Sequence, residues 1–199
     1  MTVTLRHLCV LSACLALAAC KPATESKRVE TAAAPTAAPA KTIPEPVTFA
    51  HDPALDVFGY YFTDTVVQSG NLKLSSLNIG QASDFAEWES GHRPATYAPI
   101  FLEFEDVASP TAVNEMGQAY HTVSLRVMPT AYRVDGQAVS FHGADPKLGQ
   151  LTFSGVFDLG ALKAAKGADP GEPRIVLKGD LQVGDQQFRN VSLMYFGGD

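Results

Sequence analysis

Cysteine is almost absent from this chain of 199 residues. The three cysteines, Cys9, Cys14 and Cys20, lie near the start, and the rest of the chain contains none. Even in an oxidising compartment, the region after Cys20 has no thiols from which to form a disulfide bond. This absence excludes cysteine nucleophiles and thiolate metal sites from that region, and its fold must depend on its own hydrophobic core.

Basic residues are also in the minority. The chain has 15 lysines and arginines against 21 aspartates and glutamates, which gives a formal net charge of −6. An excess of negative charge repels the phosphates of nucleic acids, and no cluster of basic and aromatic residues offsets this excess. We therefore expect no nucleic-acid partner.

Sequence motifs of common enzymes are missing as well. The chain has no G-x-S-x-G, no phosphate-binding P-loop and no HExxH. The histidines beyond the first 20 residues are isolated from one another: His51, His92, His121 and His142. Distant residues can assemble a site in three dimensions, but the motifs and spacings predict a non-enzymatic protein without a metal or cofactor.

A short apolar run lies near the start of the chain. Leu8–Ala19 is twelve residues long, carries no charge and follows Arg6 and His7. A membrane-crossing helix needs about 20 apolar residues, whereas the apolar region of a secretory signal peptide has this shorter length. The run ends in Leu17–Cys20 (LAAC), after which the sequence becomes polar.

Leu17–Cys20 resembles the lipobox of bacterial lipoproteins. The resemblance implies that residues 1–19 are a signal peptide that is removed, and that Cys20 becomes a lipidated N-terminus whose thiolate accepts the lipid. Two lipid chains already anchor a protein stably, so a triacylated cysteine implies firm membrane attachment. In that family an Asp after the cysteine marks retention in the inner membrane. Lys21 at this position implies the outer membrane, on its periplasmic face.

Residues 20–47 are predicted to comprise the lipidated cysteine and a disordered linker. Five prolines and seven alanines, but no aromatic residue, lie between positions 21 and 47. Such a segment cannot bury enough apolar surface to offset the entropy lost on ordering. An Ala- and Pro-rich linker extends by roughly 3 Å per residue where polyproline II forms. This linker would therefore hold a domain well away from the membrane surface.

Residues 48–199 are predicted to form a single domain of the all-β class. The alternation of apolar and polar residues that is typical of half-buried strands recurs in YAPIFLEFEDV (97–107) and YHTVSLRVM (120–128). Repeated turn signals favour an antiparallel β-sandwich or β-barrel of about 8–9 strands. The one short helix expected is LGALKAAK (159–166), with Gly167 as its stop.

Two tight hairpins are predicted within this domain. Asp135-Gly136 lies between the strand-like segments AYRV and QAVSF, and favours a type I′ turn because glycine tolerates a positive φ. Gly184-Asp185 lies between the longer segments IVLKGDLQV and QQFRNVSLMYF, and predicts a second hairpin.

The segment DFAEWESGHRPATY (84–97) is the strongest candidate for a binding site. Trp, Tyr and Arg are residue types that anchor interfaces, and a long connection on a β scaffold often carries function. The expected partner-binding residues are Trp88, Glu89, His92, Arg93 and Tyr97. The alternative is that Phe85 and Trp88, three residues apart, pack a short helical turn onto the core. A second and weaker candidate, ASPTAVNEMGQAY (108–120), could share the same end of the domain.

An acidic run at Glu103, Glu105 and Asp106 leaves two interpretations open. Glu103 and Glu105 project from the same face of a predicted strand, where paired carboxylates could serve acid–base chemistry or bind Ca²⁺. The alternative is a solvated sheet face whose charges also prevent edge-to-edge aggregation. We favour the solvated face.

Two functions are favoured at this point, and a third class, a hydrolase, would depend on His51, His92 and the carboxylates. The first is a non-enzymatic binding module, anchored under the outer membrane, that engages a periplasmic protein as an inhibitor, an immunity protein or an envelope-assembly factor. The second is a lipocalin-like carrier of a lipid or another small apolar molecule. The tail GDLQVGDQQFRNVSLMYF resembles the final hairpin of the periplasmic polyisoprenoid-binding barrels, although the other strands of that family are not matched.

Overall fold

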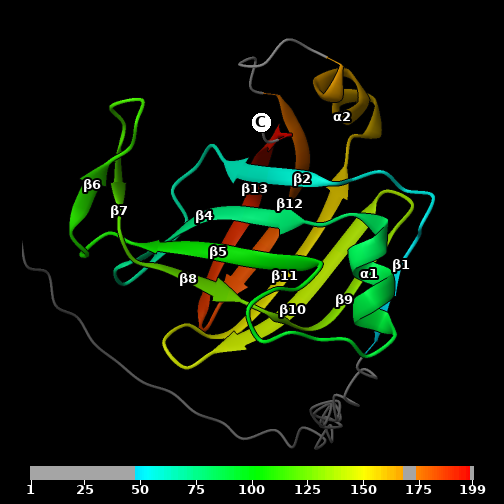
Figure 1. Cartoon of the computed structure of the whole chain (residues 1–199), viewed down its shortest axis with the longest axis horizontal. Helices are drawn as coiled ribbons and strands as arrows, with labels where there is room; N and C mark the ends of the chain where they lie inside the picture. The colour runs from blue at the N-terminus through cyan, green and yellow to red at the C-terminus, as the bar shows by residue number, and fades with distance from the viewer. Residues whose placement is uncertain (1–47, 168–173, 198–199) are drawn as a thin grey trace, which may run out of the picture. The chain divides into compact units, whose positions relative to one another are not determined.

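The computed structural model describes residues 48–167 and 174–197, and Figure 1 shows how their elements are arranged. These residues form thirteen strands and two helices. The all-β class expected from the sequence is therefore confirmed. The signal peptide expected at 1–19, the lipidated Cys20 and the linker at 20–47 lie outside the described residues.

The elements follow one another along the chain in short segments. The strands are β1 (Phe49–His51), β2 (Gly59–Thr63), β3 (Gln68–Ser69), β4 (Leu72–Ile79), β5 (Ile100–Asp106), β6 (Thr111–Val113), β7 (Ala119–His121), β8 (Ser124–Val127), β9 (Pro129–Asp135), β10 (Ala138–Asp145), β11 (Gly149–Phe157), β12 (Ile175–Val183) and β13 (Gln186–Phe196). The helices are α1 (Ala82–Glu89) and α2 (Leu159–Lys166).

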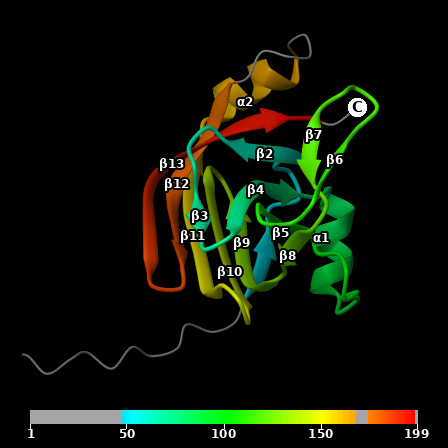
Figure 2. The same cartoon turned by 90° about the vertical axis from the view of Figure 1, so that its left-hand side faces the viewer.

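Eleven of these strands form one continuous sheet. Its order is β1-β9-β10-β11-β12-β13-β2-β4-β5-β8, with β3 paired to β4 beside this path. The pairs are antiparallel except for β1 with β9, which run parallel. The sheet curls into a half-barrel, so that β2, β4, β5 and β8 cross over β9–β13 (Figures 1 and 2). Only Met128 separates β8 from β9, and at this point the chain turns from one layer into the other.

The expected number of elements was too low. The sequence predicted about 8–9 strands and one helix, whereas the described residues contain thirteen strands and two helices. Four of the additional strands, β1, β3, β6 and β7, have only two or three residues, too few for an alternating pattern to be visible. The additional helix, α1, lies in the segment that was predicted to be a connection.

Both predicted hairpins are present, but one turn is displaced by a residue. Val183 pairs with Gln186 around Gly184-Asp185, as expected. Asp135 pairs with Ala138, so the loop is Gly136-Gln137 and not Asp135-Gly136. Only the glycine of this loop has a positive φ, of 52°. A positive φ at the first loop residue alone is typical of a type II′ turn, not of the type I′ turn expected.

Helix α2 occupies the predicted residues. The Asp158 side chain accepts a hydrogen bond from the backbone N–H of Ala161 and caps the N-terminus. Gly167 lies at the C-terminal cap, and Leu162 is the residue that the helix buries.

The concave interior of the curled sheet is filled by the hydrophobic core. Its largest fully buried aromatic side chains are Tyr61, Phe104, Tyr132, Phe141 and Phe157. They come from both layers of the half-barrel. Burial of one such side chain stabilises the fold by roughly 1.5–3 kcal/mol, so contact between the layers holds the curled shape.

The curl of the sheet depends on glycines in its central strands. Gly155 of β11 pairs directly with Gly179 of β12, and the Phe153 ring lies over both. A Cβ atom built on Gly179 would lie 2.7 Å from the Cα of Gly155 and closer still to the carbonyl oxygen of Ser154. Glycines at such positions let a sheet bend, and a neighbouring aromatic ring covers the backbone that they leave bare.

We predict that Gly179→Ala lowers the free energy of unfolding by about 3 kcal/mol, because the added methyl group meets backbone atoms that cannot move aside. The matched control is Gly160→Ala in α2, where the nearest atom is a side-chain oxygen at 3.3 Å. This control should be neutral or slightly stabilising, because alanine favours helices over glycine. Urea unfolding followed by Trp88 fluorescence measures both variants, and equal effects in the two would contradict the role of the glycine pair.

Candidate functional site

Helix α1 lies at the end of the half-barrel beside β1 (Figure 1). It buries Phe85 and Trp88, three residues apart, on the face that packs against the core. Trp88 is only 6 % exposed. The alternative interpretation of the sequence, a short helical turn packed through these two rings, is therefore the arrangement that forms.

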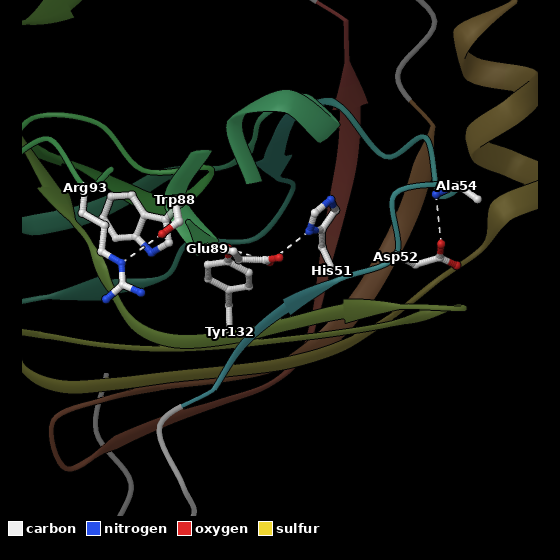
Figure 3. Close-up of polar contacts among 7 residues, drawn as sticks. All are labelled: His51, Asp52, Ala54, Trp88, Glu89, Arg93 and Tyr132. Atoms are coloured by element: carbon white, nitrogen blue, oxygen red, sulfur yellow. Dashed lines mark hydrogen bonds and ion pairs between the residues drawn. The ribbon is translucent and has the colours of Figure 1, made fainter. Parts of the chain in front are cut away.

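Glu89, the last residue of α1, is held by two residues from distant parts of the chain (Figure 3). Its Oε1 atom lies 2.9 Å from Nδ1 of His51 and accepts a hydrogen bond of 3.0 Å from the Tyr132 hydroxyl. Burial raises the pKa of Tyr132 well above its ordinary value, and the neighbouring Glu89 raises this pKa further. The Tyr132 hydroxyl therefore remains protonated and donates to the carboxylate.

His51 is held against α1 by two contacts, the hydrogen bond to Glu89 and a stacking contact with Phe85. Its ring stacks on the Phe85 ring at a centroid distance of 4.6 Å, and its side chain is 9 % exposed. The second ring nitrogen, Nε2, points away from Glu89 in Figure 3 and has no hydrogen-bond partner within residues 48–167 and 174–197. This histidine was isolated in the sequence, and no local pattern linked it to Glu89.

Arg93 packs over the aromatic residues at the other end of this site. Its Nε donates to the carbonyl oxygen of Trp88 at 3.0 Å, and its guanidinium lies 4.4 Å from the centre of the Phe49 ring. Such a cation–π contact contributes about 0.5–1 kcal/mol when exposed. His92 is different, because it is exposed and pairs loosely with exposed Glu87 at 3.5 Å.

Tyr97 lies apart from Trp88 and its neighbours. Its hydroxyl donates to Asp84 of α1 at 3.0 Å, and its ring packs edge-on against Phe101 of β5. Partial burial, followed by the charge of Asp84, raises the pKa of Tyr97 to about 12. The structure therefore brings Trp88, Glu89 and Arg93 together, leaves His92 exposed nearby, and places Tyr97 on a different surface.

Tyr97 belongs to an exposed aromatic surface that the sequence analysis missed. Its four members are Tyr60 (41 % exposed), Phe62 (37 %), Tyr97 (39 %) and Phe196 (44 %), and we call them the aromatic face. The cross-strand pairs Phe196–Tyr60, Tyr60–Asn78 and Asn78–Phe101 form one row on the convex side of the sheet. The alternation in GYYFT (59–63) is the sequence feature that corresponds to this surface, since Tyr60 and Phe62 flank the buried Tyr61 and lie on the exposed side of the strand.

The second candidate segment, 108–120, is not at the same end as α1. It forms most of a small hairpin of β6 and β7, which projects from the opposite end of the domain (Figure 1). The expectation of a shared end was wrong. The hairpin exposes Val113, Met116 and Tyr120.

The two glutamates of the acidic run are paired with basic residues on neighbouring strands. Glu105 accepts a hydrogen bond from Lys73 at 2.7 Å, and Glu103 accepts one from Arg126 at 3.2 Å. These contacts fit the solvated sheet face. Among the described residues no group of three His, Cys, Asp or Glu side chains forms a candidate metal site, and no helix there has the length and hydropathy needed to cross a membrane.

We predict that Glu89→Ala lowers the free energy of unfolding by about 2–3 kcal/mol, because it leaves the buried donors of His51 and Tyr132 without their acceptor. Glu87→Ala on the same helix is the matched control. It should change stability by less than about 0.5 kcal/mol, because its pair with His92 is exposed. Thermal or urea unfolding compares the two, and a Glu89 variant as stable as the Glu87 variant would contradict the network.

Comparison of this chain with protein-family models, with curated proteins and with solved structures gives no match. The function of the site is therefore inferred from the geometry and chemistry of its own residues.

Proposed function

We propose that this chain is a lipid-anchored binding protein at the periplasmic side of the outer membrane, and that its β domain engages a protein partner through the aromatic face. The proposal assigns no enzymatic reaction to the domain. The single observation that carries it is the clustering of Tyr60, Phe62, Tyr97 and Phe196 as exposed rings on one surface. Tyr97 was among the partner-binding residues expected from the sequence, and the other three extend that surface.

Exposed aromatic clusters are informative because scattered apolar residues are common on surfaces, whereas contiguous patches mark binding sites. Phe62 and Phe196 contact each other edge to face at 6.0 Å, so the patch is preorganised. Tyr and Phe are enriched in the centres of protein interfaces. Trp88, by contrast, supports the surface from within the core and is not itself a contact residue in this proposal.

The charge of the domain indicates what kind of partner it favours. Without residues 1–19, which contain one basic residue and no acidic one, 14 basic and 21 acidic residues remain. Asp84 accepts the Tyr97 hydrogen bond at the edge of the aromatic face. A basic partner would gain association rate by electrostatic steering toward such a domain.

The interior of the sheet does not favour the alternative function, a lipid carrier. A carrier needs an internal apolar cavity, whereas the interior positions hold large buried side chains such as Phe104, Phe141 and Phe157. We therefore propose the protein-binding function and not the carrier.

We predict that a photocrosslinkable amino acid placed at position 62 captures the same protein in living cells as one placed at position 97. A photocrosslinkable amino acid at position 116, in the β6–β7 hairpin, should not capture that protein. With the purified pair, Phe62→Ser should weaken binding about thirtyfold, because buried aromatic anchors contribute 2 kcal/mol or more. Met116→Ser is the matched control, since Met116 is 76 % exposed and lies in the β6–β7 hairpin, outside the aromatic face. Equal capture from positions 62 and 116, or equal affinity of both variants, would refute the proposed surface.

The anchor is tested separately. Cells that express the full chain and are labelled with palmitate should yield a protein that begins at residue 20, carries lipid on Cys20 and sediments with the outer membrane. Cys20→Ser should abolish the incorporation of palmitate, because serine lacks the thiolate that accepts the lipid. Mass spectrometry that finds Met1 retained, or Cys20 unmodified, would remove the anchor from the proposal but leave the aromatic face in place.

A further inference from the structure

A cleft of about 340 Å³ lies between the loop at 52–58 and the N-terminus of α1. Its volume is at the lower end of the range for small-molecule sites. Its walls are mostly apolar, formed by Leu55, Val57, Phe58, Phe85 and Val134. His51 also lines this cleft, which connects it to the polar network of Glu89 and Tyr132.

The orientation of His51 gives the cleft a fixed hydrogen-bond acceptor. The Glu89 carboxylate can only accept, so Nδ1 of His51 carries the proton in their contact. In the neutral form of the ring, Nε2 then carries the lone pair. Nε2 exposes less than 1 Å² and has no partner among the described residues. A buried acceptor without a donor is unfavourable, and a donor supplied by a ligand would remove this cost.

The start of α1 adds hydrogen-bond donors to the same cleft. Gln81 and Ala82, the cap and first residue of the helix, both line it. The first N–H groups of a helix have no acceptor within the helix. The N–H of Gln81 is taken by Asp84 at 2.7 Å, whereas that of Ala82 is available to a ligand.

The charges around the cleft are mixed. Asp52 and Asp56 line it and would repel an anion. The positive end of the helix dipole at Ala82 and the ammonium group of Lys166, which pairs with Asp56, would oppose a cation. The surroundings therefore suit a neutral ligand that both donates and accepts hydrogen bonds.

We propose that this cleft binds a small neutral molecule with neighbouring hydroxyl groups, of the class of a sugar ring. One hydroxyl donates to Nε2 of His51, another accepts from the N–H of Ala82, and the C–H face of the ring packs on the apolar wall at Leu55 and Phe58. Because Nε2 is buried, the loop at 52–58 shifts outward as the ligand enters. This site is separate from the aromatic face and does not depend on the protein-binding proposal.

The test is nuclear magnetic resonance of the full chain, carrying Cys20→Ser and labelled with ¹⁵N-histidine. It is titrated with glucose, with N-acetylglucosamine and, as charged controls, with phosphate and butylammonium. His51 should show the Nδ1–H tautomer before addition, and its Nε2 resonance should move on addition of at least one sugar. The His92 resonances should stay unchanged, because that ring is exposed elsewhere. His51→Phe, which keeps a ring on Phe85 but removes Nε2, should weaken binding about tenfold or more.

Ala82→Pro gives a second variant that does not disturb the Glu89 network. Proline is well tolerated at the first position of a helix, and Gln81 already has the extended conformation that precedes proline, with φ −77° and ψ 163°. The Ala82→Pro substitution removes the N–H donor of residue 82 and should weaken sugar binding several-fold, without a change in the free energy of unfolding. His92→Ala is the control for both variants.

Three results would overturn the proposal: no movement of the His51 resonances with either sugar, equal sugar binding by the wild type and by both variants, or a response only to phosphate or butylammonium. The first would mean that water alone satisfies Nε2. The last would mean that the cleft selects charge and not hydroxyl groups. None of these results bears on the aromatic face, which is tested by crosslinking.

Discussion

The contact between β11 and β12 at Gly155 and Gly179 is the constraint on which the rest of the structure depends. A side chain at Gly179 would meet the backbone of Ser154 and Gly155, and one at Gly155 would meet the Phe153 ring, which covers both glycines. The bend that follows turns a sheet of eleven strands back over itself, so that its two layers enclose a common core. Both surfaces proposed for binding are consequences of that curl: the aromatic face lies on its convex side, and α1 lies at its end (Figure 1).

Helix α1 connects these two surfaces although it has only eight residues. Its buried residues Phe85 and Trp88 fix it on the core, and Glu89 at its end orients His51. On the other side, Asp84 accepts the hydrogen bond of Tyr97 in the aromatic face. A helix this short is marginal in isolation, so its position depends on these tertiary contacts. Any shift of α1 therefore changes the surroundings of both Tyr97 and His51.

Local patterns in the sequence predicted the parts of the fold that are formed by local interactions. Alternation in 97–107 corresponds to β5, Gly184-Asp185 forms its hairpin, and α2 spans the predicted residues 159–166 and stops at Gly167. Helix α1 was predicted only as an alternative, a short helical turn packed through Phe85 and Trp88, because two buried residues are too few for a helical period to stand out. The aromatic face was not predicted, because alternation in GYYFT (59–63) indicates a strand with one buried side but does not indicate which other rings lie beside its exposed side.

The polar site could not be predicted from such patterns. His51 and Tyr132 meet Glu89 from positions 38 and 43 residues away in the chain, and β1 reaches β9 through a parallel pairing that has no turn signal. Strand β1 also has a mechanical consequence. It is the first strand of the domain, so tension applied at residue 48 is carried first by the three-residue ladder between β1 and β9. Phe49 transmits such a load to Arg93, and His51 transmits it to Glu89, so a pull on the chain reaches the end of α1 through these two contacts.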